Sequence, residues 1–299
     1  MKTKLIALLL VMIFLTAHTV KAESKVLLRF NFQKGSIYEM TMNMLSDINQ
    51  EMMGQQMDIL QKLEMVSTYE VLDVLPGNEF LIEYSFQKMK INTTVNGQET
   101  SMDSESTDND PKNDFLKNLS SIKVKVKMDS KGKILEVEGM EEYANKMAGN
   151  PQLAQSIPMF TDENNFKSFV EQTFGYLPET EVEVGSKWNT SIKTPAFMDM
   201  EVVMNFEVAN ILDDQVILNV TSDINMETPM DMNGVKMNIK MAGSQTGTMA
   251  LDLNNCIEGS SDMVMKFDAN IKMKNPQSGE DMEIPMVMNS VIKSSIVKK

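Results

Sequence analysis

The chain has 299 residues, with 42 acidic and 28 basic side chains and a formal net charge of −14. Such an excess of negative charge repels nucleic acid and anionic lipid surfaces, so both are excluded as partners. Cys256 is the single cysteine, so no internal disulfide can form and the fold must depend on its hydrophobic core. We expect Cys256 to be buried and unreactive.

Residues 1–22 have the pattern of an export signal. Two lysines precede the apolar run 5–15, and Val20 and Ala22 are small residues at the −3 and −1 positions of a cleavage site. The apolar run is shorter than the roughly 20 residues of a membrane span, and no cysteine follows to accept a lipid. We therefore expect cleavage after Ala22 and an extracytoplasmic protein, periplasmic or secreted, without a transmembrane segment. Loss of Lys2, Lys4 and Lys21 changes the charge from −14 to −17.

The mature chain has no histidine, because the only one, His18, lies in the signal. Histidine is the most common general base and metal ligand, and no serine–lysine or carboxylate motif here has a supporting second element. We expect a protein that is not an enzyme and has no cofactor or metal, although a paired-carboxylate site stays open as an alternative.

Apolar and polar residues alternate with period two through most of the chain, which predicts half-buried strands. The runs lie at 40–44, 122–128, 202–208, 237–241, 249–253, 263–273 and 282–288. Turn residues separate them at 76–78, 96–97, 130–132, 213–214, 233–234 and 278–279. One apolar and one charged face predict an antiparallel sheet with one side in water.

The period changes to 3.6 in the middle of the chain. Residues 140–147 and 162–174 carry apolar side chains at helical spacing, with Asp162 as a predicted N-cap and Gly175 as the stop. Residues 114–119 predict one further helical turn. The acidic loop 103–110 lacks the glycine and terminal glutamate of a calcium loop, and a solvated loop is expected.

A weak internal repeat surrounds this helical segment. Residues 69–74 match 206–211 at an offset of 137, and the same offset carries Asn96-Gly97 onto Asn233-Gly234. The chain is thus divided into a signal (1–22), a first β unit (23–138), a helical insert (139–178) and a second β unit (179–299), with 23–299 as one domain. The predicted fold class is mainly β: a curved antiparallel sheet or half-barrel built from two related units with a short helical insert.

The strand starts Lys34-Gly35-Ser36-Ile37-Tyr38 and Val184-Gly185-Ser186-Lys187-Trp188, with the central helices, resemble an exported bacterial family known only as a domain of unknown function. The resemblance covers nearly all of the mature chain and implies export and a β-rich fold. It transfers no catalytic residue. At fold level the pattern is also similar to the half-barrel of lipoprotein carriers.

Methionine is the unusual component, with 30 residues in the chain. Flexible thioethers suit an adaptable apolar cavity, so we expect a binding protein for an apolar ligand such as a lipid or lipoprotein acyl chain. The predicted lining residues are Met40, Met42, Met44, Met237, Met241, Met263, Met265 and Phe267. Two alternatives stay open: an envelope interaction protein with a filled methionine core, and a Cu(I) site of thioethers from Met226, Met230 and Met232 or from residues 40–44.

Overall fold

The computed structural model describes residues 25–52, 54–120, 122–141, 163–194, 200–232, 235–274 and 279–299. The predicted signal, most of the predicted helix at 140–147, the N-cap Asp162 and the turn at 233–234 lie outside these residues. In the part described, the first strands and helix are β1 (Ile37–Met52), β2 (Gln55–Leu75), β3 (Glu79–Val95), β4 (Gln98–Asp103), α2 (Pro111–Ser120), β5 (Lys123–Met128) and β6 (Ile134–Glu138). The later elements are α5 (Glu163–Phe174), β7 (Lys187–Thr194), β8 (Met200–Ile211), β9 (Gln215–Met232), β10 (Val235–Asp252), β11 (Glu258–Lys274) and β12 (Asp281–Lys298).

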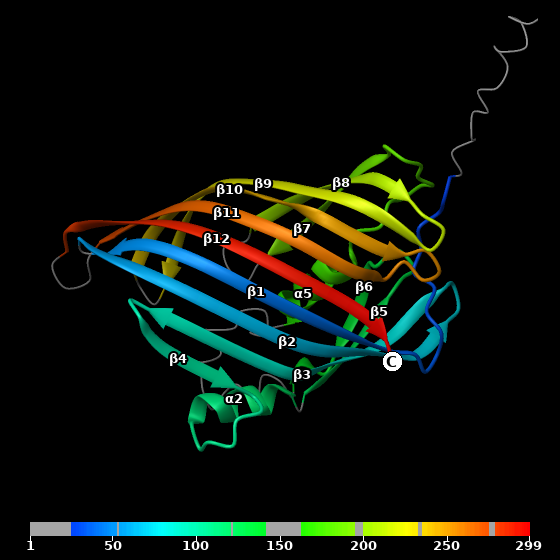
Figure 1. The fold of residues 1–299 in the computed structure, drawn as a ribbon, viewed down its shortest axis with the longest axis horizontal. Coiled ribbons are helices and arrows are strands. Elements are labelled where there is room, and N and C mark those ends of the chain that lie inside the picture. Colours follow the sequence, from blue (N-terminus) through cyan, green and yellow to red (C-terminus); the bar gives the residue numbers. More distant parts are fainter. Residues whose placement is uncertain are drawn as a thin grey trace, which may run out of the picture.

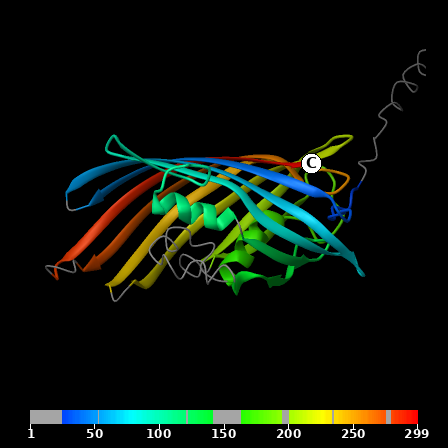
Figure 2. The ribbon, with the colours of Figure 1, turned by 90° about the horizontal axis from the view of Figure 1, so that it is seen from below.

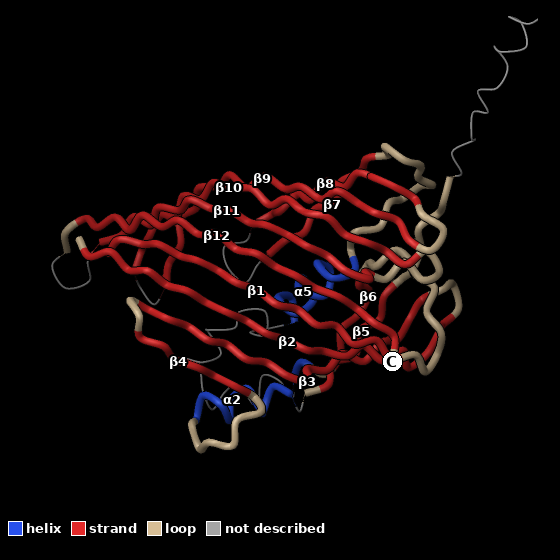
Figure 3. Tube along the Cα trace, in the orientation of Figure 1, coloured by secondary structure: helices blue, strands red, loops and turns tan. Residues whose placement is uncertain are grey.

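The described strands form one antiparallel sheet of 12 strands (Figures 1 and 3). Its order is β6-β5-β3-β2-β1-β12-β11-β10-β9-β8-β7, with β4 paired to the outer half of β3. The pairing of β1 with β12 joins strands from both predicted β units. The edge strands β6 and β7 are not paired with each other, so the sheet stays an open half-barrel. The prediction of a mainly β fold with a curved antiparallel sheet is confirmed.

The two predicted units begin with the same backbone hydrogen bonds. The amide of Gly35 donates to the Val71 carbonyl at 2.8 Å, and the amide of Gly185 donates to the Val208 carbonyl at 2.8 Å. The residue after Val71 and the residue after Val208 are each bypassed by a register shift. Val71 and Val208 are 137 residues apart, which is the offset read from the sequence, and Gly35 and Gly185 are the glycines of the two similar strand starts. Duplication as the origin of this equivalence stays a prediction.

Side chains are packed most densely at one end of the sheet, which we call the closed end. Here α5 lies against both edge strands, β6 and β7, and so covers the seam between them. Phe174 of α5 meets the rings of Phe30 and Tyr69, with centroids 5.5 and 5.2 Å away. Tyr84 contacts Phe166 at 5.5 Å. Figure 2 shows the sheet arched over both helices.

The other end carries the hairpins β1–β2, β3–β4, β9–β10 and β11–β12, and we call it the open end. The long strands reach beyond the helices in this direction (Figure 1). Helix α2 packs on β3 and β4. It is a full helix where the sequence predicted one turn, because Asp110 caps its first turn by accepting from the Lys112 amide at 2.9 Å and Pro111 fits the first helical position. None of the described helices is both long and apolar enough to cross a membrane.

Candidate functional site

The two faces of the sheet differ in chemistry. The convex face carries ion pairs between strands, such as Lys272 with Glu283 at 2.8 Å and Lys293 with Asp262 at 3.1 Å. The concave face carries the alternate residues, which are mostly apolar. Because the strands are in register, the inward residues form transverse rows that cross the sheet from strand to strand.

Four such rows form the floor of the open end, which we call the open-end strip. Most of their side chains are half-buried, and a few are buried. The rows are Val95-Ile59-Ile48-Met288-Phe267-Gly243-Ile224, then Met57-Gln50-Met286-Ala269-Met241-Met226, then Ile284-Ile271-Ile239-Thr228, then Met282-Met273-Met237. Only Gln50 and Thr228 among them are polar. A continuous apolar surface therefore extends to the tips of the hairpins.

One row on the closed-end side of this strip is polar, and we call it the polar belt. Nine neighbouring strands, from β3 to β7 in the order of the sheet, contribute one residue each: Thr93, Gln61, Ser46, Ser290, Met265, Gln245, Ser222, Met204 and Thr190. The hydroxyls of Ser46 and Ser290 share a hydrogen bond of 2.7 Å. The hydroxyls of Ser222 and Thr190 are buried and have no hydrogen-bond partner among the residues described.

The predicted lining residues all lie at inward positions of β1, β10 and β11, but at different depths. Met40 is 6% exposed and belongs to the closed-end core, where its Sδ accepts from the Tyr69 hydroxyl at 3.3 Å. Met42 lies on the closed-end side of the polar belt, two rows away from it. Met44 and Met263 share the row between Met42 and the belt. Met265 is in the belt itself.

Phe267, Met241 and Met237 lie in the open-end strip, where the structure brings them together with methionines of β12. Sequence reasoning did not assign Met282, Met286 and Met288 to the site. Their alternation was visible, but the adjacency of β12 to β11 and β1 was not.

Two glycines shape the concave face of β10. A Cβ on Gly243 would lie 2.4 Å from Cδ1 of Phe267, and one on Gly247 would lie 2.5 Å from Sδ of Met263. The ring of Phe267 and the thioether of Met263 therefore fold sideways over the neighbouring strand. Each of these two side chains thus occupies the space that a Cβ on the neighbouring glycine would fill.

A carboxyl group is buried at the closed end. Glu258 of β11 accepts a hydrogen bond from the Ser294 hydroxyl, and the Oγ atoms of Ser294 and Ser261 are 2.7 Å apart. Burial raises the pKa of the Glu258 carboxyl above its ordinary value, and the hydrogen bonds of the two serines offset part of that rise. Ser261 is buried, whereas Glu258 and Ser294 are half-buried as whole residues, and the hydrogen bonds of the cluster lie within it.

The raised pKa predicts that the contribution of Glu258 to the free energy of unfolding falls as pH rises. The folded-state pKa of Glu258 lies above the unfolded value of about 4.3, so the folded state holds the proton more tightly, and stability is lost as pH rises through that interval. Glu258→Gln should be at least as stable as the wild type at pH 7 and lose this advantage near pH 4. Urea midpoints across that range measure the effect. Glu99→Gln, on an exposed position, is the control, and equal pH profiles for all three proteins would contradict the prediction.

The single cysteine and single arginine have structural positions. Cys256 is 2% exposed, and burial raises the pKa of its thiol to about 11, so the reactive thiolate is scarce at neutral pH. The prediction of a buried thiol is confirmed. Arg29 donates to the carbonyls of Pro178 and Glu179 at 2.6 Å each, which fixes the N-terminal segment to the loop after α5.

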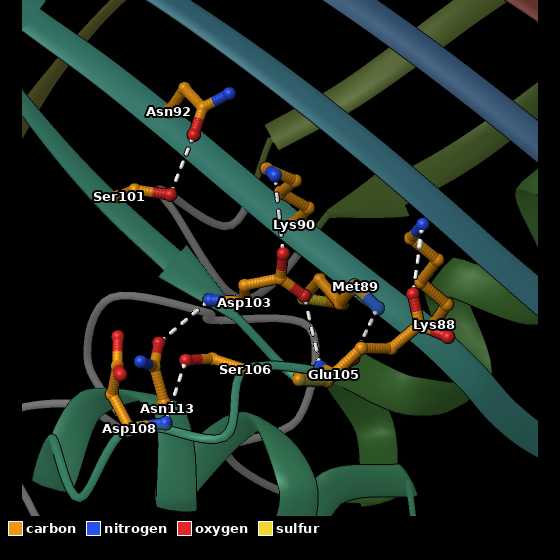
Figure 4. Close-up of polar contacts among 11 residues, drawn as sticks. Lys88, Met89, Lys90, Asn92, Ser101, Asp103, Glu105, Ser106, Asp108 and Asn113 are labelled. Atoms are coloured by element: carbon orange, nitrogen blue, oxygen red, sulfur yellow. Dashed lines mark hydrogen bonds and ion pairs between the residues drawn. The ribbon is translucent and has the colours of Figure 1, made fainter.

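The acidic loop is tied to β3 (Figure 4). Lys90 pairs with Asp103 at 3.2 Å, and Lys88 pairs with Glu105 at 2.9 Å. The Asn113 side-chain oxygen accepts from the Asp103 amide at 2.7 Å. The carboxylates of Asp103 and Glu105 thus have lysine partners. Within the described ranges, no group of three or more His, Cys, Asp or Glu side chains is arranged to hold a metal ion. The predicted thioether copper site is not tested by this and stays a prediction.

Two hollows lie at the sheet surface. One, of about 580 Å³, lies at the tips of β10, β11 and β12. It is lined by Met237, Met273 and Met282 of the open-end strip and by outward polar residues such as Lys236, Lys272 and Glu283. The other, of about 290 Å³, is lined mainly by outward polar residues of β7, β8 and β9. Of these two hollows, the first includes residues of the open-end strip and the second does not.

These features define a class of protein: an open half-barrel with helices on its concave side, whose apolar floor is buried at one end and mostly half-buried at the other. The chain belongs to a family of unknown function (DUF6263), whose model matches residues 77–258. No curated protein matches the sequence.

Among solved structures, the fold is similar to one described as "Lipid-protein interactions in lipovitellin", with a TM-score of 0.51 and 10% identity. The match covers 89% of this chain and 25% of that chain, so the chain spans about a quarter of its length. An outer membrane channel from Pseudomonas putida F1 matches with a TM-score of 0.21 and 5% identity, over 90% of this chain and 97% of that one.

Proposed function

We propose that this chain is an exported, non-catalytic protein that binds an apolar ligand of lipid type on the open-end strip. The observation that carries the proposal is the run of four inward rows that are apolar in all but two positions and mostly half-buried. Exposed apolar surface of this extent is unusual on a soluble protein and marks binding sites. The convex face of the same strands carries ion pairs as well as some exposed apolar residues, such as Leu45, Val291 and Val264, so the larger continuous apolar surface lies on the inside.

The dimensions of the strip suit an acyl chain. Met265 in the belt and Met273 near the hairpin tip are eight residues apart (273 − 265 = 8), which is roughly 27 Å along a strand. One acyl chain spans half of a bilayer core, or about 15 Å. The methionines can adjust to different chains because each has three rotatable bonds. The likeness of the fold to a lipovitellin structure, described by its lipid interactions, supports the same ligand class.

Gentle purification of the mature protein from its own envelope, followed by native mass spectrometry, tests the proposal directly. We expect an extra mass of several hundred daltons that is released on denaturation and is soluble in organic solvent. A bare polypeptide that also fails to take up added lipid would reject the proposal and favour the envelope-interaction alternative.

A pair of neighbouring substitutions locates the ligand. Met241 faces the strip, whereas Ala242 is exposed on the other face of β10. Met241→Asp should lower the affinity for monopalmitoylglycerol by about tenfold or more, because an unpaired charge would be placed against the acyl chain. Ala242→Asp should leave it unchanged. Titration of both variants by tryptophan fluorescence measures this, and equal affinities would place the ligand elsewhere.

A further inference from the structure

The polar belt interrupts a face that is otherwise apolar. The row on its closed-end side contains only Ile91, Leu63, Met44, Ile292, Met263, Gly247, Val220, Phe206 and Trp188. The row on its open-end side is apolar as well. In the belt row, nearly every strand contributes a polar residue, and the rows on both sides are apolar. The belt is therefore a band of hydrogen-bonding groups across the concave floor.

Part of this band has no hydrogen-bond partner within the described residues. Ser46 and Ser290 bond to each other, but the Ser222 hydroxyl, in a residue only 1% exposed, has no partner among the described residues. The Thr190 hydroxyl, two strands away in the same row beyond Met204, is also buried and has no partner among the described residues. A buried hydroxyl without a partner destabilises the fold, so its presence calls for another explanation.

We propose that the polar belt binds the uncharged polar group of the acyl ligand, an ester carbonyl or a hydroxyl, through Ser222, Thr190 and Gln245. This inference rests on the proposed function and adds the ligand's orientation and chemical class. The acyl chain lies along the open-end strip and the polar group lies in the belt. In the same row, Met265 lies beside Gln245 and Met204 lies beside Ser222. Their flexible side chains can move aside to admit the polar group.

The belt also selects against charged ligands. It contains hydroxyls, amides and thioethers but no lysine or arginine, so a carboxylate or phosphate would be desolvated there without a counter-charge. The negative net charge of the protein also repels anionic ligands. A neutral acylglycerol is therefore favoured over a free fatty acid of the same chain length.

Three probes with the same chain length test the inference on the mature protein: monopalmitoylglycerol, hexadecane and palmitate. We expect monopalmitoylglycerol to bind tightest. The double variant Ser222→Ala with Thr190→Val should weaken monopalmitoylglycerol by about 3- to 10-fold, the effect of one to two lost hydrogen bonds, and leave hexadecane unchanged. Thr221→Ala, on the convex face beside Ser222, is the matched control and should change neither.

Stability without ligand supplies a second readout. Since no described residue pairs with the Ser222 hydroxyl, Ser222→Ala should melt at the same or a higher temperature than the wild type while binding the neutral lipid less tightly. Equal affinity of the wild type for hexadecane and monopalmitoylglycerol, or equal loss of both in the variant, overturns the belt inference but leaves the proposed function standing. Failure of all three probes to bind rejects both.

Discussion

Replacing Phe174 with alanine is expected to lower the free energy of unfolding by about 3–5 kcal/mol. Phe174 is 1% exposed and its ring meets Phe30 from the N-terminal segment and Tyr69 from β2. The substitution leaves a cavity where three parts of the chain meet, and it loosens α5 over the seam between β6 and β7. Chemical denaturation of the mature protein measures the change.

The control for this substitution lies on the same helix. Gln172 is exposed, and Gln172→Ala should change the free energy of unfolding by less than about 0.5 kcal/mol. If the two variants were equally stable, α5 would not be the element that completes the closed end.

Replacing Gly243 with alanine is expected to destabilise the protein by about 1–3 kcal/mol. The new Cβ would lie 2.2 Å from the Lys266 carbonyl oxygen and 2.4 Å from the Phe267 ring, so β10 and β11 must separate or the ring must leave its position. Without this close contact, alanine would stabilise a strand relative to glycine by about 0.5–1 kcal/mol. A loss of stability on Gly243→Ala would therefore show that β11 approaches β10 closely at this position.

Gly259 provides a matched glycine. A Cβ there meets only the Ala250 carbonyl oxygen, at an ordinary 3.6 Å, so Gly259→Ala should be neutral or slightly stabilising. Thermal melts of the two variants, recorded together, decide the matter. A Gly243→Ala protein as stable as the Gly259→Ala protein would show that Phe267 does not depend on the glycine for its position.

Local alternation made the strands predictable, because period two is a property of neighbouring residues along the chain. The run from Met263 to Met273 was predicted as half-buried and is β11, with one apolar and one polar face. The helix ending at Gly175 was predicted from its spacing and is α5. Helix α2 was underestimated, since its capping by Asp110 is clear only from the hydrogen bond itself.

The candidate site was only partly predictable. Met237, Met241 and Phe267 lie in the open-end strip, whereas Met40 has the same alternating pattern and belongs to the closed-end core. Alternation assigns a residue to a face of the sheet but carries no information about its depth along that face. The polar belt could not be found at all, since its members come from nine strands and none is unusual within its own.

The sequence by itself determined part of the strands, with their inward and outward residues, and several turns, because these follow from backbone period and side-chain polarity over a few residues. It predicted no alternating run for β9, and the two runs predicted at 237–241 and 249–253 are one strand, β10. Tertiary structure alone decided the pairing of β1 with β12, the helix across the seam and the alignment of rows. Register between strands depends on contacts between residues far apart in the chain. A one-residue slip would move the belt serines to the other face, so the site exists only once the whole sheet has formed.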